Sequence, residues 1–90
     1  MEIDLNLIRV GKPWHILNDK TGEVENSGMK VILSSMKQEI TPDYNGFTIY
    51  TGNIPTEHFD NLKTKELPLK VKAIFTITSD SKLKLIDIKY

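Results

Sequence analysis

The alternation of apolar and polar residues is the feature that most limits how this 90-residue chain can fold. Residues 2–7 read Glu-Ile-Asp-Leu-Asn-Leu, and residues 69–78 carry an apolar side chain at every second position up to Ile77. A strand with one buried face has this period of two, whereas a helix with one buried face repeats every three or four residues. The sequence therefore predicts a fold built mainly of strands.

The alternation changes phase soon after the first strand-like segment. The slip spans residues 8–10, and Gly11 and Pro13 follow before strand character resumes over residues 14–17. An extra residue inserted into one strand, or a sharp corner, produces such a slip. We therefore expect a bulge or corner inside one strand rather than the start of a new element.

Turn signals separate the remaining elements. Within them, Gly28 marks a bulge or a close approach of another backbone, and the phase slips again beside Ile86. The expected order is a long strand at 24–35, a turn at 42–46, a strand at 47–51, a short helix over 57–62 capped by Thr56, and strands at 69–78 and 82–90.

This order of three strands, a helix and two strands is that of the OB-fold, a small barrel. Barrels need bulges and glycines to turn their corners, and the chain supplies both. We therefore predict an all-β fold with one short helix, a five-stranded OB-like barrel, as a single domain over residues 1–90. An SH3-like barrel and an open sheet are the alternatives.

The composition limits the class of protein and its surroundings. The chain has no cysteine, and its N-terminus, Met1–Asp4, is acidic rather than basic and apolar, so neither disulfides nor a secretory signal is expected. No apolar run is long enough to span a bilayer. We expect a cytoplasmic protein without membrane contact. Its core must be thin, so self-association into a homodimer is also expected.

Charge is distributed unevenly, although the formal net charge is zero. From Asn61 onward seven lysines face three acidic residues, which gives this part of the chain +4 and residues 1–60 a charge of −4. A basic C-terminal region can form a local patch on a neutral protein. Solvated lysines on strand faces are the simpler interpretation of the same pattern.

The segment at residues 9–16 holds the strongest candidate site. It brings Arg9, Lys12 and the single tryptophan, Trp14, together at a break between two strand segments. An aromatic ring beside cations suits an unpaired nucleic-acid strand, whose bases stack and whose phosphates are charged. A Trp14 that caps the barrel core is the competing interpretation.

Further candidates come from aromatic and basic residues elsewhere. We assign Phe47 to the core, which turns Tyr50 and the turn residue Tyr44 outward as secondary stacking candidates. Two lysines of one strand share a face, and lysines on strands can contact phosphates. The predicted nucleic-acid-binding residues are Arg9, Lys12, Trp14, Lys30, Tyr44, Tyr50, Lys70 and Lys72.

The patterns that mark catalytic and metal sites are missing from the sequence. His58 lies between Glu57 and Asp60, but these three side chains do not share one helix face, and we interpret His58 as a polar surface residue. No His or Cys spacing suits a metal ion, and neither a phosphate-binding loop nor a nucleophile elbow occurs. We expect neither an enzyme nor a bound cofactor.

The segment Arg9-x-Gly11-Lys12-Pro13-Trp14 resembles a segment of the gene V protein family, the single-stranded-DNA-binding proteins of filamentous phages. That family has Arg-x-Gly-Lys-Pro-Tyr at the entry to a strand of a small OB-like barrel, and its last strand is broadly similar to residues 82–90. The resemblance implies a cytoplasmic dimer that coats replicating single strands. It also implies that Trp14 replaces the tyrosine as a strand-contacting ring, with Arg9 and Lys12 beside the path of the strand.

This sequence departs from the family in two ways. The region before the motif is shorter, which leaves no room there for the family's protruding basic hairpin, and the chain is neutral where the family is basic. Both differences are compatible with a related single-strand-binding protein from a phage or mobile element of another host.

The leading hypothesis is therefore a protein that coats or protects single-stranded DNA during phage or mobile-element replication, alongside replication proteins. Stacking and phosphate contacts serve RNA equally, so the sequence does not separate the two ligands. The alternative is a small β-barrel interaction module, an adaptor or inhibitor, that binds a peptide by strand addition and no nucleic acid. A buried Trp14 favours the module, and Trp14 on a groove floor favours the DNA-binding protein.

Overall fold

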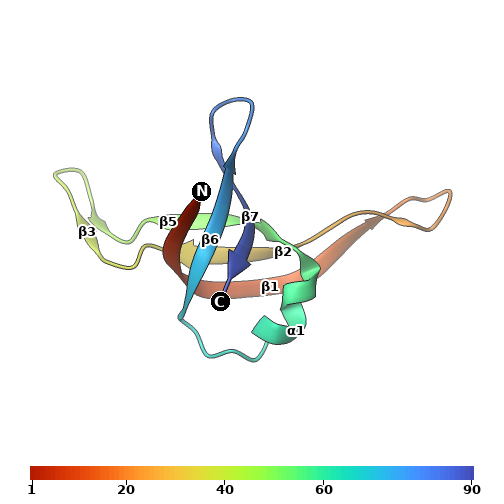
Figure 1. Ribbon diagram of the computed structural model, residues 1–90, viewed down its shortest axis with the longest axis horizontal. Helices are drawn as coiled ribbons and strands as arrows, with labels where there is room; N and C mark the ends of the chain where they lie inside the picture. The colour runs from red at the N-terminus through yellow and green to blue at the C-terminus, as the bar shows by residue number, and fades with distance from the viewer.

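The computed structural model describes residues 1–90 as a small β protein with one short helical segment (Figure 1). The elements in chain order are β1 (Glu2–Leu17), β2 (Val24–Ser34), β3 (Glu39–Ile40), β4 (Asn45–Gly46), β5 (Ile49–Ile54), the 3₁₀ turn η1 (Thr56–His58), α1 (Phe59–Leu62), β6 (Leu69–Ile77) and β7 (Leu83–Lys89).

Five antiparallel strands form one sheet in the order β5-β2-β1-β6-β7, and β3 and β4 pair as a separate ribbon. With η1 and α1 between β5 and β6, this is the strand order of the OB-fold. The prediction of an all-β, five-stranded OB-like barrel is confirmed. The short strands β3 and β4 were not predicted, and the third barrel strand begins at Ile49 rather than at Phe47.

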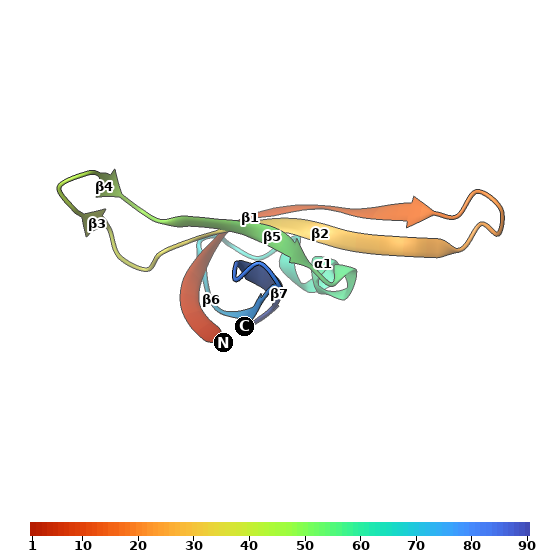
Figure 2. The same ribbon diagram turned by 90° about the horizontal axis from the view of Figure 1, so that it is seen from above.

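The long first strand, β1, belongs to both halves of the barrel. It pairs with β6 from Glu2 to Leu7 and with β2 from Asn6 to Leu17, so Asn6 and Leu7 have a partner on both sides. The register with β2 shifts by one residue between Leu7 and Arg9 and again between Val10 and Pro13. Figure 2 shows the N-terminal part bending away from the layer of β1, β2 and β5 toward β6 and β7. The predicted bulge inside one strand is confirmed.

The barrel is closed by packing, rather than by hydrogen bonds, between the two edge strands of the sheet. β5 and β7 stand at the two ends of the hydrogen-bonded strand order. They meet at Gly52, where an added Cβ would lie 2.7 Å from the Cβ of Leu85. Ile86 is the extra residue in the pairing of β7 with β6, as the slip in the sequence predicts. The absence of a side chain at Gly52 lets the two edges approach.

Twelve buried apolar side chains form the core. The alternating inward residues of β2, namely Met29, Val31 and Leu33, have no exposed surface, and Phe75 of β6 is 5% exposed. These positions match the alternation of the sequence. Phe59 packs against the same cluster from the helical segment.

Three predicted orientations are wrong. Phe47 is 54% exposed, whereas Tyr50 packs against the core with its ring centroid 5.7 Å from that of Phe75. The reason is register, because Tyr50 pairs with Leu33, an inward residue of β2. Ile77, predicted to point inward, is 68% exposed; it is the last residue of β6, at the start of the β6–β7 hairpin. Figure 1 shows this hairpin extending beyond the other strands.

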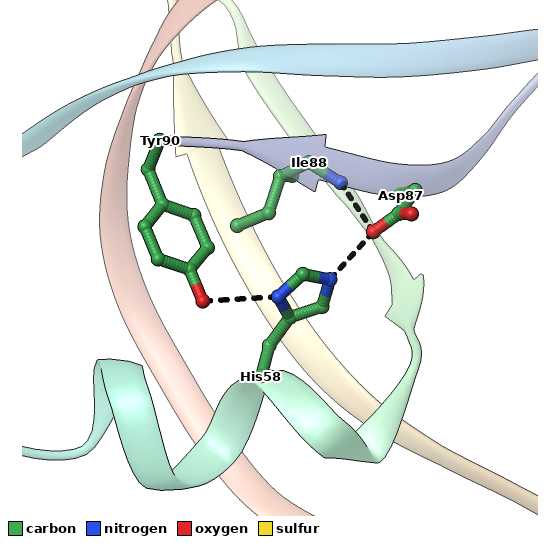
Figure 3. A network of polar contacts seen from close by, with 4 residues as sticks. All are labelled: His58, Asp87, Ile88 and Tyr90. Carbon is green, nitrogen blue, oxygen red and sulfur yellow. Dashed lines mark hydrogen bonds and ion pairs between the residues drawn. The ribbon is translucent and has the colours of Figure 1, made fainter.

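The helical segment is held by His58 rather than by a side-chain cap. Pro55 is the N-cap of η1, and Thr56 makes no capping hydrogen bond, so that prediction is wrong. His58 Nε2 lies 2.6 Å from Asp87 Oδ1, and its Nδ1 lies 3.0 Å from the Tyr90 hydroxyl (Figure 3). Its side chain is 16% exposed, so His58 is not a surface residue but a link between the helical segment and β7.

Two extensions make the molecule long. The β1–β2 hairpin and residues 36–49, which we call the 36–49 arm, project from opposite sides of the barrel (Figures 1 and 2). The radius of gyration is 15.1 Å, whereas a compact domain of this length has one of about 12 Å. None of the helical segments has the length and apolar character needed to cross a bilayer.

Replacement of Gly52 by alanine tests how the barrel closes. The new Cβ would clash with the Cβ of Leu85, which cannot rotate away, so β5 and β7 must separate. We expect Gly52→Ala to lower the free energy of unfolding by about 1–3 kcal/mol, measured by urea denaturation. Thr51→Ser, an exposed change on the same strand, should leave it within about 0.5 kcal/mol. Equal stability of the two variants would contradict this account.

Candidate functional site

Arg9 and Trp14 point to the same side of the sheet because a bulge lies between them. Five positions apart, they would lie on opposite faces of a regular strand. The register shift between Val10 and Pro13 removes this difference, so that Arg9 pairs with Ile32 and Trp14 with Gly28. We call this side of β1, β2 and β5 the outer face; it faces away from β6, β7 and α1 (Figure 2). Its residues here are Arg9, Trp14, Gly28, Lys30, Ile32, Thr51 and Asn53.

The Trp14 indole packs over Gly28 on the neighbouring strand. A Cβ added to Gly28 would lie 2.7 Å from Trp14 Cζ2 and 3.1 Å from Cε2. The indole Nε1–H donates a hydrogen bond to Asn53 Oδ1 at 3.0 Å, so the side chain reaches from β1 across β2 to β5. Trp14 is half-buried and does not belong to the core cluster, so it does not cap the core. Gly28 lies neither at a bulge nor against another backbone. Its missing side chain instead makes room for the Trp14 ring.

A cavity of about 490 Å³ adjoins the indole. It lies where the edge of β5 meets β7 and the base of the β1–β2 hairpin, and Lys84 contributes a cation to its lining. Its lining residues are Trp14, Asn26, Ser27, Thr51, Gly52, Asn53, Ile54, Pro55, Leu83, Lys84, Leu85 and Ile86. The half-buried Trp14 therefore lines a concave surface, which is the position expected of a ring that contacts a ligand.

A second cavity of about 180 Å³ carries two positive charges. Arg9, Gly11, Lys30 and Ile32 line it. A side chain at Gly11 would meet the carbonyl oxygen of Lys30 at 2.9 Å, so the missing side chain lets β1 approach the backbone of β2 closely at the bulge. Neither Arg9 nor Lys30 forms an ion pair. Lys30 pairs in register with Asn53, the hydrogen-bond partner of Trp14, so the smaller cavity on the outer face lies close to the edge of β5, where the larger cavity is found.

Lys12 is exposed at the bulge between Arg9 and Trp14 but lines neither cavity. The two tyrosines predicted as stacking residues are also elsewhere. Tyr50 belongs to the inner side of β5, against the core. Tyr44 lies on the 36–49 arm, where its hydroxyl donates a hydrogen bond to Glu39 at 2.9 Å. This bond to a carboxylate raises the pKa of the Tyr44 phenol.

Lys70 and Lys72 are exposed on β6, in the other half of the barrel. They pair with Asn6 and Asp4, residues of β1 that precede its first bulge. Neither lysine lines a cavity. The structure therefore brings Arg9, Trp14 and Lys30 together on the outer face but does not add Lys70 and Lys72 to them.

The other C-terminal lysines are partly engaged with acidic residues. Lys63, Lys82 and Lys89 form ion pairs with Asp60, Asp80 and Glu2, respectively. The Lys89 ammonium, hydrogen-bonded to Glu2, lowers the pKa of that carboxyl. The tip of the β1–β2 hairpin is acidic, because residues 18–25 include three acidic residues and one lysine. The cations beside Trp14 thus come from Arg9, Lys30 and Lys84 rather than from a continuous basic C-terminal patch.

The cluster of Asp87, His58 and Tyr90 is a structural contact. Both imidazole nitrogens are occupied, one by a carboxylate and one by a phenol, and no serine, threonine or cysteine takes part (Figure 3). The structure has no group of three or more His, Cys, Asp or Glu side chains placed to hold a metal ion.

Comparison of the chain with protein-family models, curated proteins and solved structures finds no significant match. The resemblance of residues 9–14 to the gene V protein family therefore stays a prediction from sequence.

Two site residues were missed by sequence reasoning. Asn53 and Lys84 reach the site from β5 and β7, strands that are distant from Trp14 in sequence. No local pattern marks either residue, because their position depends on strand register and on the closure of the barrel.

Replacement of Gly28 by alanine tests whether the Trp14 indole packs against this glycine. The new methyl group would displace the ring from β2 and weaken the bond from Nε1 to Asn53. We expect the fluorescence emission of Trp14, the single tryptophan, to shift to longer wavelength. Ser27→Ala, an exposed change beside it, should leave the spectrum unchanged. An unshifted spectrum in Gly28→Ala would mean that the indole does not rest on this glycine.

Proposed function

We propose that the protein binds single-stranded DNA on its outer face. The observation that carries the proposal is the half-buried Trp14 ring, fixed by Gly28 and Asn53 in a concave surface beside Arg9 and Lys30. Fixed rings stack on exposed bases of any sequence, and each stacked base contributes about 1–3 kcal/mol. Arg9 and Lys30 form no ion pairs, so they can neutralise phosphates without first breaking one.

The shape of the outer face suits one unpaired strand. The larger cavity at Trp14 has room for a base, and the smaller one holds Arg9 and Lys30, which would contact phosphates of the adjoining nucleotides. In the OB-fold, the face of the second and third strands and the adjoining hairpins are the usual surface for oligonucleotides. Here those strands are β2 and β5, which carry Lys30 and Asn53.

The biological role that we propose follows from the resemblance of residues 9–14 to the gene V protein family. It is to coat or protect single strands during replication of a phage or mobile element in the cytoplasm, together with replication proteins. A neutral net charge is compatible with this role, because Arg9 and Lys30 form no ion pair and keep their charges available on the outer face.

The salt dependence of binding to oligo(dT) tests the proposed function. We expect an affinity that falls with salt, and we expect Arg9→Gln and Lys30→Gln each to reduce the slope of log Kobs against log[salt] by about 0.7. The measurement is fluorescence anisotropy of a labelled oligonucleotide at several salt concentrations, repeated with oligo(U) to compare DNA with RNA.

Lys65→Gln is the matched control, because Lys65 is exposed, forms no ion pair and lines neither cavity. It should change the slope little. An absence of binding to any oligonucleotide would refute the proposed function. Equal effects of Lys65→Gln and Lys30→Gln would refute the assignment to the outer face.

We also propose that the protein forms a homodimer through the 36–49 arm. Five large apolar side chains of the arm are exposed by 40% or more, namely Met36, Ile40, Tyr44, Phe47 and Ile49. The surface of the chain is 6551 Å², whereas a compact protein of this mass exposes about 5,400 Å². The excess, to which the arm and the β1–β2 hairpin both contribute, is of the order of the ~800 Å² that each partner buries in a stable interface. A second copy, which offers the same arm in return, is the occupant that we propose.

Substitutions in the arm test the dimer. Wild-type protein should sediment with twice the mass of one chain, and Ile40→Ser or Phe47→Ser should shift it toward a single chain with unchanged circular dichroism. Ile77→Ser is the control, because Ile77 is 68% exposed but lies on the β6–β7 hairpin. A monomeric wild type at all concentrations would refute the dimer. Equal dissociation in Ile77→Ser would move the interface away from the arm.

A further inference from the structure

The Asn53 side-chain amide has a defined orientation. The indole Nε1–H of Trp14 can only donate a hydrogen bond, so the Asn53 atom 3.0 Å away must be the amide oxygen. The amide NH₂ group of Asn53 therefore points away from the indole nitrogen. It makes no hydrogen bond to any other residue of the chain, and Asn53 is exposed.

This unpaired donor group lies beside the ring on which a base would stack. Asn53 and Trp14 both line the larger cavity, and Asn53 pairs in register with Lys30 of the outer face. A base stacked on the indole with its hydrogen-bonding edge toward β5 would meet Asn53. The group that it meets there is the NH₂ donor, because the bond from Trp14 holds the Asn53 oxygen toward the indole.

We propose that Asn53 is a specificity-determining residue that favours bases rich in carbonyl oxygens, thymine above all, over adenine. This inference rests on the proposed function of the outer face. Thymine offers two carbonyl acceptors beside one ring N–H, whereas the pairing edge of adenine offers a single ring-nitrogen acceptor beside an amino group that donates. An amide free to rotate would serve both bases, since it could present its oxygen to the adenine amino group. The bond from Trp14 prevents that rotation, because it holds the oxygen toward the indole.

The experiment compares affinities for labelled oligo(dT) and oligo(dA) of equal length. Self-stacking of oligo(dA) weakens its binding to every variant alike, so the informative quantity is the change in the ratio of the two affinities. One added hydrogen bond corresponds to a preference of about fivefold for each base that is read. We expect Asn53→Ala to reduce the ratio by about this factor.

The variant Trp14→Phe tests whether the orientation of the Asn53 amide matters, and not only its presence. It keeps an aromatic ring for stacking but removes the N–H that orients Asn53, so the ratio should fall as in Asn53→Ala even though Asn53 is intact. Lys30→Gln is the matched control, because it should weaken both oligonucleotides equally and leave the ratio unchanged. Thermal unfolding of each variant confirms that it is folded.

The outcomes distinguish this inference from the proposed function. Binding of both oligonucleotides with an unchanged ratio in Asn53→Ala and Trp14→Phe would overturn the role of Asn53 but leave single-strand binding intact. A ratio that falls in Asn53→Ala but not in Trp14→Phe would overturn the orienting role of the indole. Binding of neither oligonucleotide by the wild type would overturn the proposed function, and this inference with it.

Discussion

The fold depends on a single strand that serves both halves of the barrel. β1 pairs with β6 through its first residues and with β2 through the rest, and two one-residue bulges let it bend between the halves. Without the bend, β6 and β7 could not return to meet β5, and the inner faces of the two halves would not enclose one core. The bulges also set side-chain directions. Because one of them lies between Arg9 and Trp14, both side chains emerge on the outer face. The deformation that closes the barrel thus assembles the candidate site.

Glycines determine how closely the parts approach. At Gly52 the missing side chain allows β5 and β7 to meet without hydrogen bonds between them. At Gly28 it allows the Trp14 indole to lie on β2 and reach Asn53. In the first case backbone packs against a core side chain, and the consequence is stability. In the second case a polar aromatic ring is held outside the core, and the consequence is a fixed binding surface.

The sequence was sufficient for what depends on neighbouring residues. Alternation located the five barrel strands and the inward residues of β2, and the phase slips located the bulges at residues 8–13 and at Ile86. It was insufficient for what depends on register. Tyr50 points inward because it pairs with Leu33, and Lys70 lies away from Trp14 because β6 pairs with the first part of β1. Asn53 joins the site only through pairing between distant strands. Of the eight residues predicted to bind nucleic acid, only Arg9, Trp14 and Lys30 line the two cavities of the site.

The most direct test of the central claim is a chemical-shift map of the ¹⁵N-labelled protein during addition of oligo(dT). We predict the largest changes at the indole Nε1–H of Trp14, at the side-chain amide of Asn53 and at the backbone of Arg9 and Lys30. We predict little change at Lys70 and Lys72 on β6. Changes confined to β6, or to residues 36–49, would place the ligand elsewhere and contradict the assignment, and a spectrum without changes would contradict single-strand binding itself.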